Sequence, residues 1–287
     1  MKKSNVYIFN YNIGNENIYT FDIETTSIFL DKKGVFKYDK TNIQRCKDAI
    51  KIGFMWIWMF GINEDVIYGR TWDDFINFIE RLNLYDKNKK VVFVHNLSFE
   101  FNFLLNVIDD FEVFARKQRH PIYAKTEKYN IEFRCSYFLT NMSLEKSAET
   151  YANNYRKMSG DLDYNLTRHE KTIITEKELG YCEHDILALY GVIKWHLDKY
   201  NKIDKIPLTQ TGKIRKKLKK EVGTQKYYKK ISSMQPRSFD EFYALTKSYV
   251  GGYTHANAIN ANMLLSDVAS IDFASSYPYV MISEKYP

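Results

Sequence analysis

Several features that would point to a secreted, membrane or zinc-ribbon protein are missing from this 287-residue sequence. It has no run of 18 apolar residues, and residues 1–10 pass directly into a strand pattern without the apolar stretch of a secretory signal. The three cysteines, Cys46, Cys135 and Cys182, lie far apart and form no Cys-x-x-Cys pair. We therefore expect a protein of the reducing cytoplasm, without a disulfide framework and without a membrane partner.

An excess of acidic residues is also missing. The 42 Lys and Arg outnumber the 35 Asp and Glu, so the net charge is +7. Residues 213–230 hold nine of the basic and one of the acidic residues, which leaves 33 basic and 34 acidic residues elsewhere. This segment is either a solvated helix face or a surface that contacts phosphates. Tyr227 and Tyr228 within it are candidates for stacking on bases, although two tyrosines are weak evidence.

Enough apolar sequence is present for a core, since 45% of the residues are hydrophobic and 16% aromatic. Runs of β-branched and aromatic residues predict strands, and apolar residues at helical spacing predict helices. The expected strands are residues 6–10, 18–24, 50–62, 65–70, 90–96 and two or three more up to residue 140. The expected helices are residues 71–86, residues 98–108 behind a Ser98 cap, a short one from residue 142, and residues 174–200. This mixture predicts an α/β fold with helices packed on a mixed sheet.

Acidic residues recur at the ends of these elements. Asp22 and Glu24 stand two apart on a strand, so both side chains face the same side. Glu100 lies in the first turn of a helix, and Asp185 follows Tyr181 by one helical turn. Four carboxylates can hold two Mg²⁺ or Mn²⁺ ions, a pair that stabilises both the attacking and the leaving oxygen of a phosphodiester. Taken singly, each of these acids is also typical of an ordinary turn or helix surface.

The order of these acids and the residues around them resemble those of family B DNA polymerases. The segments FDIETTS, HNLSFEFNF and YCEHD resemble the three exonuclease motifs, above all those of the protein-primed branch of phages and linear plasmids. MSLEKSA resembles the Ser-Leu motif that holds single-stranded DNA, and YVGGYT resembles the Tyr-x-Gly-Gly motif between the exonuclease and polymerase domains. DFASSYP resembles polymerase motif A. The six motifs occur in the family's order and span residues 20–280.

The resemblance implies the N-terminal part of a protein-primed family B DNA polymerase with 3′→5′ proofreading activity. Residues 1–200 would form a ribonuclease H-like α/β exonuclease domain, 201–248 a basic, DNA-contacting linker, and 249–287 the start of the polymerase palm. The implied partners are single-stranded and primer-template DNA, a terminal priming protein and a separate polymerase C-terminal half. The implied cofactors are two Mg²⁺ or Mn²⁺ ions per exonuclease site, and the implied location is the cytoplasm of a bacterial host.

The resemblance also implies roles for individual residues. The exonuclease metals would be held by Asp22, Glu24, Glu100 and Asp185, and Tyr181 would orient the attacking water. The 3′ end of a single strand would be gripped by Thr25, His95, Asn96, Phe99, Ser143 and Leu144. DNA passing between the two sites would contact Tyr249, Gly251 and Gly252. Asp272 would be a polymerase metal ligand, and Tyr277 would lie under the sugar of the incoming nucleotide. Without the resemblance, His95 and Phe99 read as packing residues and the two glycines as a turn.

Three departures from the family pattern bear on activity. Glu100 stands where the second exonuclease motif has Asp, and a displacement of about 1 Å can cost about 100-fold in rate. Ser159 stands where the family has a catalytic lysine, and Lys157 is the candidate substitute. Asp272 has no second polymerase Asp to accompany it, and one carboxylate cannot hold a two-metal site. We therefore expect a fragment that does not extend a primer alone.

Two alternatives remain open beside the exonuclease. The replacements at Glu100 and Ser159 are compatible with a catalytically weakened, single-stranded-DNA-binding half of a split polymerase. Strand affinity without metal-dependent cleavage would distinguish that protein from an enzyme. A free-standing ribonuclease on the same fold is the other alternative. The segments YVGGYT and DFASSYP argue against it, because a ribonuclease has no use for them.

Overall fold

The computed structural model describes residues 17–30, 36–37, 50–152, 155, 162, 166–248, 258–269, 271 and 273–284. The chain divides into two compact units, residues 1–227 and 228–287, and each is described by itself. The strand predicted over residues 6–10 lies outside the described residues. Among the helices in the described ranges, none has the length and apolar character needed to span a bilayer.

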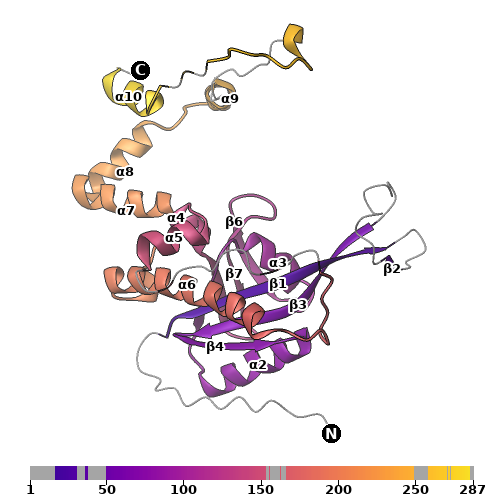
Figure 1. The fold of residues 1–287 in the computed structure, drawn as a ribbon. Coiled ribbons are helices and arrows are strands. Elements are labelled where there is room, and N and C mark those ends of the chain that lie inside the picture. Colours follow the sequence, from indigo (N-terminus) through magenta and orange to yellow (C-terminus); the bar gives the residue numbers. More distant parts are fainter. Residues whose placement is uncertain are drawn as a thin grey trace. The chain divides into compact units, whose positions relative to one another are not determined.

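A mixed sheet of eight strands forms the centre of the first unit (Figure 1). Seven strands follow the order β4-β3-β1-β5-β8-β7-β6, and β2 (Phe36–Lys37) pairs with β1. Strands β1, β5 and β8 run parallel to one another, and the other pairings are antiparallel. The bounds are β1 (Tyr19–Leu30), β3 (Ile50–Ile62), β4 (Asp65–Gly69), β5 (Lys90–Val94), β6 (Phe111–Ala115), β7 (Pro121–Thr126) and β8 (Ile131–Cys135). The predicted α/β fold with a mixed sheet is confirmed.

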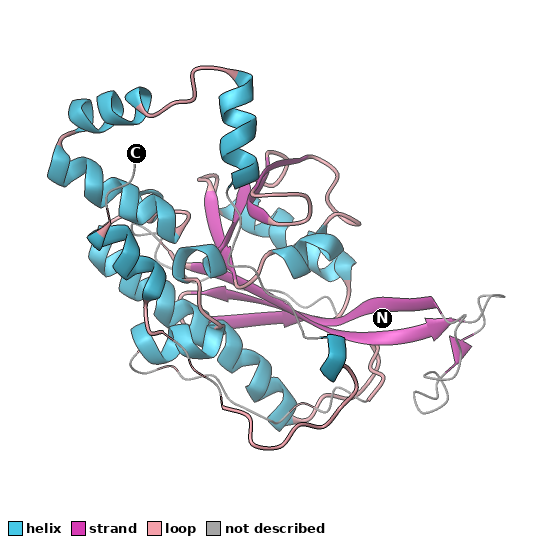
Figure 2. Ribbon diagram, turned by 90° about the horizontal axis from the view of Figure 1, so that it is seen from above, coloured by secondary structure: helices cyan, strands magenta, loops and turns pink. Residues whose placement is uncertain are grey.

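Helices cover both faces of this sheet (Figures 1 and 2). On one face, α2 (Trp72–Tyr85) and α3 (Ser98–Leu104) bury aromatic and aliphatic side chains against Trp58 and Phe60 of β3. On the other face, α6 (Glu176–Tyr200) packs against Ile57 and Met59 of the same strand, and α5 (Leu144–Tyr151) packs beside it. Since successive residues of a strand point to opposite faces, β3 is buried on both sides from Met55 to Ile62, whereas its first five residues are exposed.

Helix α2 forms where the spacing of apolar residues predicts it. Thr71 caps the helix, and its Oγ1 accepts a hydrogen bond of 3.1 Å from the Asp74 amide. The buried residues of the helix recur three and four positions apart, which places them on one stripe facing the sheet. Phe78 is at the centre of that stripe, with its ring 5.0 Å from Phe60 and 5.5 Å from Trp58. The aromatic cluster therefore fixes α2 to the sheet.

The next helix begins at Ser98 as predicted, but its predicted cap and its predicted end are wrong. Ser98 is the first residue of α3, and the N-cap position is Leu97, which forms no side-chain cap bond. The helix ends at Leu104 and does not continue to Ile108. Ile108 is nevertheless buried in the same cluster as Leu104, so its apolar character reflects core packing after the helix has ended.

The strand predicted to run to residue 140 stops at Cys135, and Ser136–Thr140 form the short helix α4. The aromatic residues in this segment favour a strand by type, but the tertiary environment overrides that preference. The helix is closed by Asn141, whose φ of 55° is left-handed. This turn brings the side chains of α4 next to the residues that follow β5, which becomes important for the cavity described below.

The segment that follows α6 belongs to the first unit and packs against its other elements. Ile203 and Ile206 are buried with residues of α5 and α6, and Arg134 of β8 donates a hydrogen bond of 3.2 Å to the Ile203 carbonyl. Helix α7 (Gln210–Val222) then begins behind Thr209, which accepts from the Gly212 amide. The second unit contains α9 (Phe239–Ser248), η2 (Ala258–Asn260) and α10 (Ser276–Ser283), and α8 (Thr224–Ser233) crosses the division. The domain boundaries near residues 200 and 248 stay predictions.

Replacing Phe78 by alanine tests the aromatic cluster. We expect Phe78→Ala to lower the free energy of unfolding by about 3–5 kcal/mol, because the ring is fully buried and leaves a cavity. The matched control is Leu84→Ala on the same helix, where the side chain is 70% exposed and the change should stay within about 0.5 kcal/mol. Urea denaturation measures both, and equal losses would contradict the assignment of the core.

Candidate active site

Two carboxylates project from one strand at an irregularity of the sheet. Asp22 and Glu24 lie on β1, with Asp22 half-buried and Glu24 buried. Glu24 is paired with Ile57 of β3, whereas Thr25 is paired with Met55, so the register shifts by one residue. Trp56 is therefore the extra residue of a β-bulge directly opposite the second acid. A bulge bends its strand and changes the direction of neighbouring side chains.

A third carboxylate comes from the long helix. Ligand oxygens of Asp22, Glu24 and Asp185 all lie within 4.8 Å of one another. Asp185 is 6% exposed, so little water screens the repulsion among the three groups. Carboxylate oxygens at this spacing are the donor set that Mg²⁺ and Mn²⁺ prefer. The structure thus brings together three of the four predicted metal ligands on β1 and α6.

Glu100 lies beside these three groups but is more deeply buried. Its side chain in α3 is 3% exposed, and within the described residues its Oε2 atom has no hydrogen-bond partner. Burial, followed by the charges of Asp22 and Glu24, raises the pKa of Glu100 well above its usual range. A buried carboxylate oxygen with no partner is costly, and a divalent cation would satisfy it. Glu100 therefore fits the fourth ligand position.

Tyr181 occupies the same face of α6 one turn before Asp185, as the spacing predicts. The ring is buried in a cluster with Trp56, Met59 and Cys182. Burial first, and then the charges of the nearby carboxylates, raise the pKa of the Cys182 thiol above its ordinary value. Cys182 is thus a neutral packing residue, while Tyr181 lies on the helix face that also carries Asp185.

A pair of arginines holds the bulge against the segment that leads into α6. The guanidinium groups of Arg70 and Arg168 lie 5.7 Å and 5.2 Å from the ring centroid of Trp56. Arg70 also donates a 2.7 Å hydrogen bond to the Trp56 carbonyl. Its other nitrogens donate to the carbonyls of Thr172 (3.0 Å) and His169 (2.8 Å). We call Arg70, Trp56 and Arg168 the arginine clamp.

The arginine clamp continues into the cap of α6. Thr175 and Glu178 form a capping box, in which each side chain accepts a hydrogen bond from the other residue's amide. Arg168 donates to Glu178 Oε1 at 2.6 Å and 3.1 Å. The helix that carries Tyr181 and Asp185 is therefore fixed at its start to the same tryptophan that forms the bulge opposite Glu24.

The residues predicted to grip a strand lie in several elements of the first unit. His95 and Asn96 follow β5, and the His95 Nδ1 atom lies 3.0 Å from the Ser136 hydroxyl. Phe99 is 42% exposed in α3, and Thr25 follows Glu24 on β1. Ser143 is the N-cap of α5, where its hydroxyl accepts a hydrogen bond from the Lys146 amide. Leu144 is the first residue of α5 and is buried in a cluster with residues of α6. Their binding roles stay predictions.

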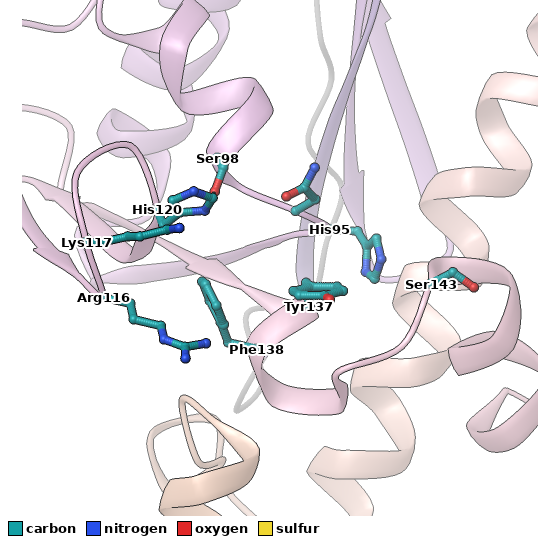
Figure 3. A pocket seen from close by; sticks show the side chains of 9 residues that line it. His95, Ser98, Arg116, Lys117, His120, Tyr137, Phe138 and Ser143 are labelled. Atoms are coloured by element: carbon teal, nitrogen blue, oxygen red, sulfur yellow. The ribbon is translucent and has the colours of Figure 1, made fainter. Parts of the chain in front are cut away.

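A cavity near these residues has further members that the sequence analysis missed. His95, Asn96 and Ser143 line it together with Ser98 (Figure 3). The remaining lining residues are Arg116, Lys117, His120, Tyr137 and Phe138. The run RKQRH between two strands is a signal that could have drawn attention to the cations. Nothing in the sequence brings it next to α4, because that requires the sheet order β5-β8-β7-β6.

Several predicted residues lie outside the described part of the chain. They are Lys157, Ser159, Tyr249, Gly251, Gly252 and Asp272. Tyr277 is described, in α10 of the second unit, and its side chain is 67% exposed. The cations of the segment 213–230 lie on α7 and α8, neither of which has a buried residue. Lys219 covers the ring of Tyr227 at 5.2 Å, and Tyr228 is 52% exposed.

The C-terminal part of the chain matches a known protein family in a sequence comparison. Residues 158–287 match DNA polymerase type B, organellar and viral. This stretch contains Tyr181, Asp185 and the segments YVGGYT and DFASSYP, so the resemblance to type B polymerases is confirmed. A comparison with curated protein sequences gives no match.

Solved structures of phi29 DNA polymerase share the fold. The complex with primer-template DNA, a post-translocation binary complex, has a TM-score of 0.58 and 17% identity over 85% of this chain and 41% of that one. The ternary complex with primer-template DNA and incoming nucleotide has a TM-score of 0.55 and 17% identity over 85% and 40%. The complex with single-stranded DNA has a TM-score of 0.54 and 16% identity over 74% and 36%. The chain thus spans 36–41% of the length of these phi29 DNA polymerase chains.

The capping box gives α6 a pH-dependent stability. Hydrogen bonds from the Thr175 amide and then from Arg168 lower the pKa of Glu178 below its ordinary value, although burial opposes this shift. A lowered pKa contributes stability that is present above the ordinary pKa and lost as the pH falls through the folded-state pKa. We expect Glu178→Gln to be about 1–2 kcal/mol less stable at pH 7 and to approach the unmodified chain near pH 3.

Thermal unfolding between these pH values measures the difference. Glu176→Gln, in the exposed first turn of the same helix, is the matched control and should change little. A deficit of Glu178→Gln that does not shrink at low pH would contradict the role of its charge.

Proposed function

We propose that this chain is the exonuclease-bearing N-terminal part of a protein-primed family B DNA polymerase. Residues 1–200 would hydrolyse the 3′-terminal phosphodiester of single-stranded DNA. The observation that carries the proposal is the meeting of Asp22, Glu24 and Asp185 within 4.8 Å, with buried Glu100 beside them. A site that concentrates so much negative charge in a protein interior favours cation binding strongly.

In this proposal the four carboxylates hold two Mg²⁺ or Mn²⁺ ions. When bound, such ions supply electrostatic stabilisation to the attacking and leaving oxygens of a phosphodiester. Tyr181 has a hydroxyl that both donates and accepts, so it can orient a water molecule beside the acids. Lys157 would assist, in place of the lysine replaced by Ser159. Water adds across the terminal phosphorus–oxygen bond, which yields a nucleoside monophosphate and a strand one nucleotide shorter.

The single strand would be gripped by residues surrounding the carboxylates. Thr25 directly follows Glu24, so it is suited to contact the terminal nucleotide. Phe99 is exposed one residue before Glu100 and offers an apolar surface to a base. Polar contacts would come from His95, Asn96 and Ser143, with Leu144 behind them. The solved structures with a similar fold include phi29 DNA polymerase bound to single-stranded DNA and to primer-template DNA. This similarity supports DNA as the proposed partner.

The C-terminal residues would serve the polymerase. We propose that residues 201–248 contact DNA, and that 249–287 contribute Tyr249, Gly251, Gly252, Asp272 and Tyr277 to the palm. Asp272 is the one carboxylate that the resemblance assigns to the polymerase metals, and a two-metal site needs more. The 287-residue chain would therefore not extend a primer alone, and a separate C-terminal half and a terminal priming protein are the proposed partners. The proposed location is the bacterial cytoplasm.

A second candidate function is favoured by one observation. Glu100 is 3% exposed beside two other acids, and this burial raises its pKa, so burial opposes the ionised form that a metal requires. A chain in which the metal does not bind would hold single-stranded DNA without cutting it. It would act as the DNA-binding half of a split polymerase.

Digestion of a 5′-labelled single-stranded oligonucleotide with Mg²⁺ or Mn²⁺ tests the proposed function. We expect a descending ladder of products from the unmodified chain. The Asp22→Ala/Asp185→Ala variant should lose at least about 1,000-fold in rate, since it removes two of the proposed metal ligands.

The matched control is Asp198→Ala, which removes an exposed acid of α6 that pairs with Lys194 at 3.7 Å. Its rate should equal that of the unmodified chain. Binding of the oligonucleotide without a ladder of shorter products would contradict the proposed exonuclease activity. It would favour the second candidate function, a DNA-binding half of a split polymerase.

Replacement of Glu100 by glutamine tests two effects of the carboxylate, its proposed role as a metal ligand and the loss of stability caused by its burial beside other acids. We expect Glu100→Gln to hydrolyse the oligonucleotide about 100-fold more slowly, because a neutral amide is a poorer ligand than a carboxylate. Without metal, its unfolding temperature should be equal or higher, because a buried carboxyl beside two acids is removed. Glu100→Asp keeps a carboxylate and should retain more activity than Glu100→Gln. An unchanged rate in Glu100→Gln would show that Glu100 is no ligand.

A further inference from the structure

The carboxylates of the candidate active site come from two elements, and neither element alone sets the distance between them. Asp22 and Glu24 belong to β1, whereas Asp185 belongs to α6, which packs over β1 and β3 on one face of the sheet (Figure 1). Repulsion among the acids favours their separation. A bound Mg²⁺ requires its oxygen ligands at defined distances and angles. Contacts that fix α6 relative to β1 therefore bear directly on cation binding.

Arg70 makes directional contacts of this kind. It directly follows β4, and its Nε atom donates a hydrogen bond of 2.7 Å to the Trp56 carbonyl at the bulge. Its two terminal nitrogens donate to the carbonyls of Thr172 at 3.0 Å and His169 at 2.8 Å. A guanidinium carries its donors in a rigid planar fork, so one side chain holds all three carbonyls in a fixed arrangement. Arg70 thus ties the bulge of β3 to the segment that leads into α6.

Arg168 makes a second connection between the bulge and α6. Its guanidinium lies 5.2 Å from the ring centroid of Trp56, and it donates to Glu178 Oε1 at 2.6 Å and 3.1 Å. The side chains of Arg168 and Glu178 are only 5% and 15% exposed, so water screens this ion pair little. Glu178 forms the capping box of α6 with Thr175. One buried cation therefore joins Trp56 to the first turn of the helix.

A third contact ties the segment 166–175 to β1 itself. The Thr26 hydroxyl donates a hydrogen bond of 3.3 Å to the Leu166 carbonyl, and Thr26 lies two residues beyond Glu24 on β1. The segment is thus held by β1, by β3 and by the residue after β4 immediately before it enters α6. Asp185 lies in the first half of that helix. Because a helix moves as a rigid element, a displacement of its start also displaces Asp185.

We propose that Arg70 and Arg168 are positioning residues of the acidic site. They set the separation between Glu24 on β1 and Asp185 on α6, and thereby the affinity of the site for divalent cations. The proposal rests on the proposed function, in which these carboxylates hold Mg²⁺ or Mn²⁺. Both arginines act through Trp56 and the start of α6, and the proposal assigns neither of them a contact with the cation or with DNA.

The sign of the change in cation affinity separates positioning from two simpler roles of an arginine. Removal of a nearby positive charge would by itself strengthen cation binding, because less repulsion opposes the incoming ion. A loss of stability alone would leave the affinity of the folded protein unchanged. A loss of positioning weakens binding, because the ligand oxygens no longer meet at the required distances. Replacement by alanine therefore has a different outcome for each role.

Binding of Mn²⁺ to the full chain, measured from the electron paramagnetic resonance signal of the free ion, tests the proposal without any cleavage. We expect Arg70→Ala and Arg168→Ala each to bind Mn²⁺ at least about tenfold more weakly, the loss that is usual when a group that orients metal ligands is removed. Arg70→Lys keeps the charge but loses the planar fork, so it should also weaken binding. Unchanged or tighter binding in all three variants would overturn the proposal.

Two controls on α2, on the opposite face of the sheet, exclude general effects. Arg81→Ala removes an exposed arginine and should leave Mn²⁺ binding unchanged. Leu82→Ala removes a buried side chain and should lower the unfolding temperature without changing the affinity for Mn²⁺. All measurements are made at a temperature at which each variant is folded, and Arg70→Lys and Arg168→Lys replace any alanine variant that does not fold. A loss of affinity in Leu82→Ala as large as in Arg70→Ala would overturn the positioning role.

Digestion of the labelled oligonucleotide over a range of Mn²⁺ concentrations separates this proposal from the proposed function. The half-saturating Mn²⁺ concentration should rise about tenfold in Arg70→Ala, in step with the loss of affinity. Weaker Mn²⁺ binding in the arginine variants of a chain that digests no DNA would contradict the exonuclease and support the positioning role. Digestion by the unmodified chain, with unchanged Mn²⁺ binding in the variants, would overturn the positioning role and leave the exonuclease supported. Absence of Mn²⁺ binding in the unmodified chain would overturn both.

Discussion

Repulsion among clustered carboxylates is the constraint on which the rest of the first unit depends. Three ligand groups meet within 4.8 Å, and a fourth acid is buried beside them. Two unit charges 4 Å apart interact by about 4 kcal/mol at an effective dielectric constant near 20, a large part of the about 5–15 kcal/mol by which proteins are stable. The rest of the fold must therefore hold β1 and α6 together against this repulsion.

The opposing interactions lie immediately around the acids. Trp56, Met59 and Ile186 fill the space between the sheet and α6, so burial of apolar surface holds the helix in place. The arginine clamp adds cations that face a tryptophan ring, and Arg70 also donates hydrogen bonds to backbone carbonyls. These contacts join β3 to the segment that leads into α6. Positive charge therefore stabilises the scaffold that carries the acids.

The sequence predicted the acids well because their geometry is local. The i, i+2 spacing of Asp22 and Glu24 and the i, i+4 spacing of Tyr181 and Asp185 follow from one strand and one helix. The bulge at Trp56 depends on the pairing of β1 with β3, and the clamp joins residues over 100 positions apart, as the bond from Arg70 to Thr172 shows. No local pattern predicts either of them. Helix α4 was misread for a related reason, since its aromatic residues suit a strand until the left-handed Asn141 and the cavity beside it are known.

The β-bulge has a consequence for how this protein can vary. Beyond it, β1 and β3 continue as a paired ribbon, from Thr26 opposite Phe54 to Leu30 opposite Ile50. The register between β1 and β3 differs by one residue on the two sides of the bulge, because β3 has one extra residue there. Each side can therefore keep its own register. Equal lengthening or shortening of both arms of the ribbon would leave Asp22 and Glu24 where they are. The length of the paired ribbon can thus diverge among relatives, or be changed by protein engineering, while the acidic centre keeps its geometry.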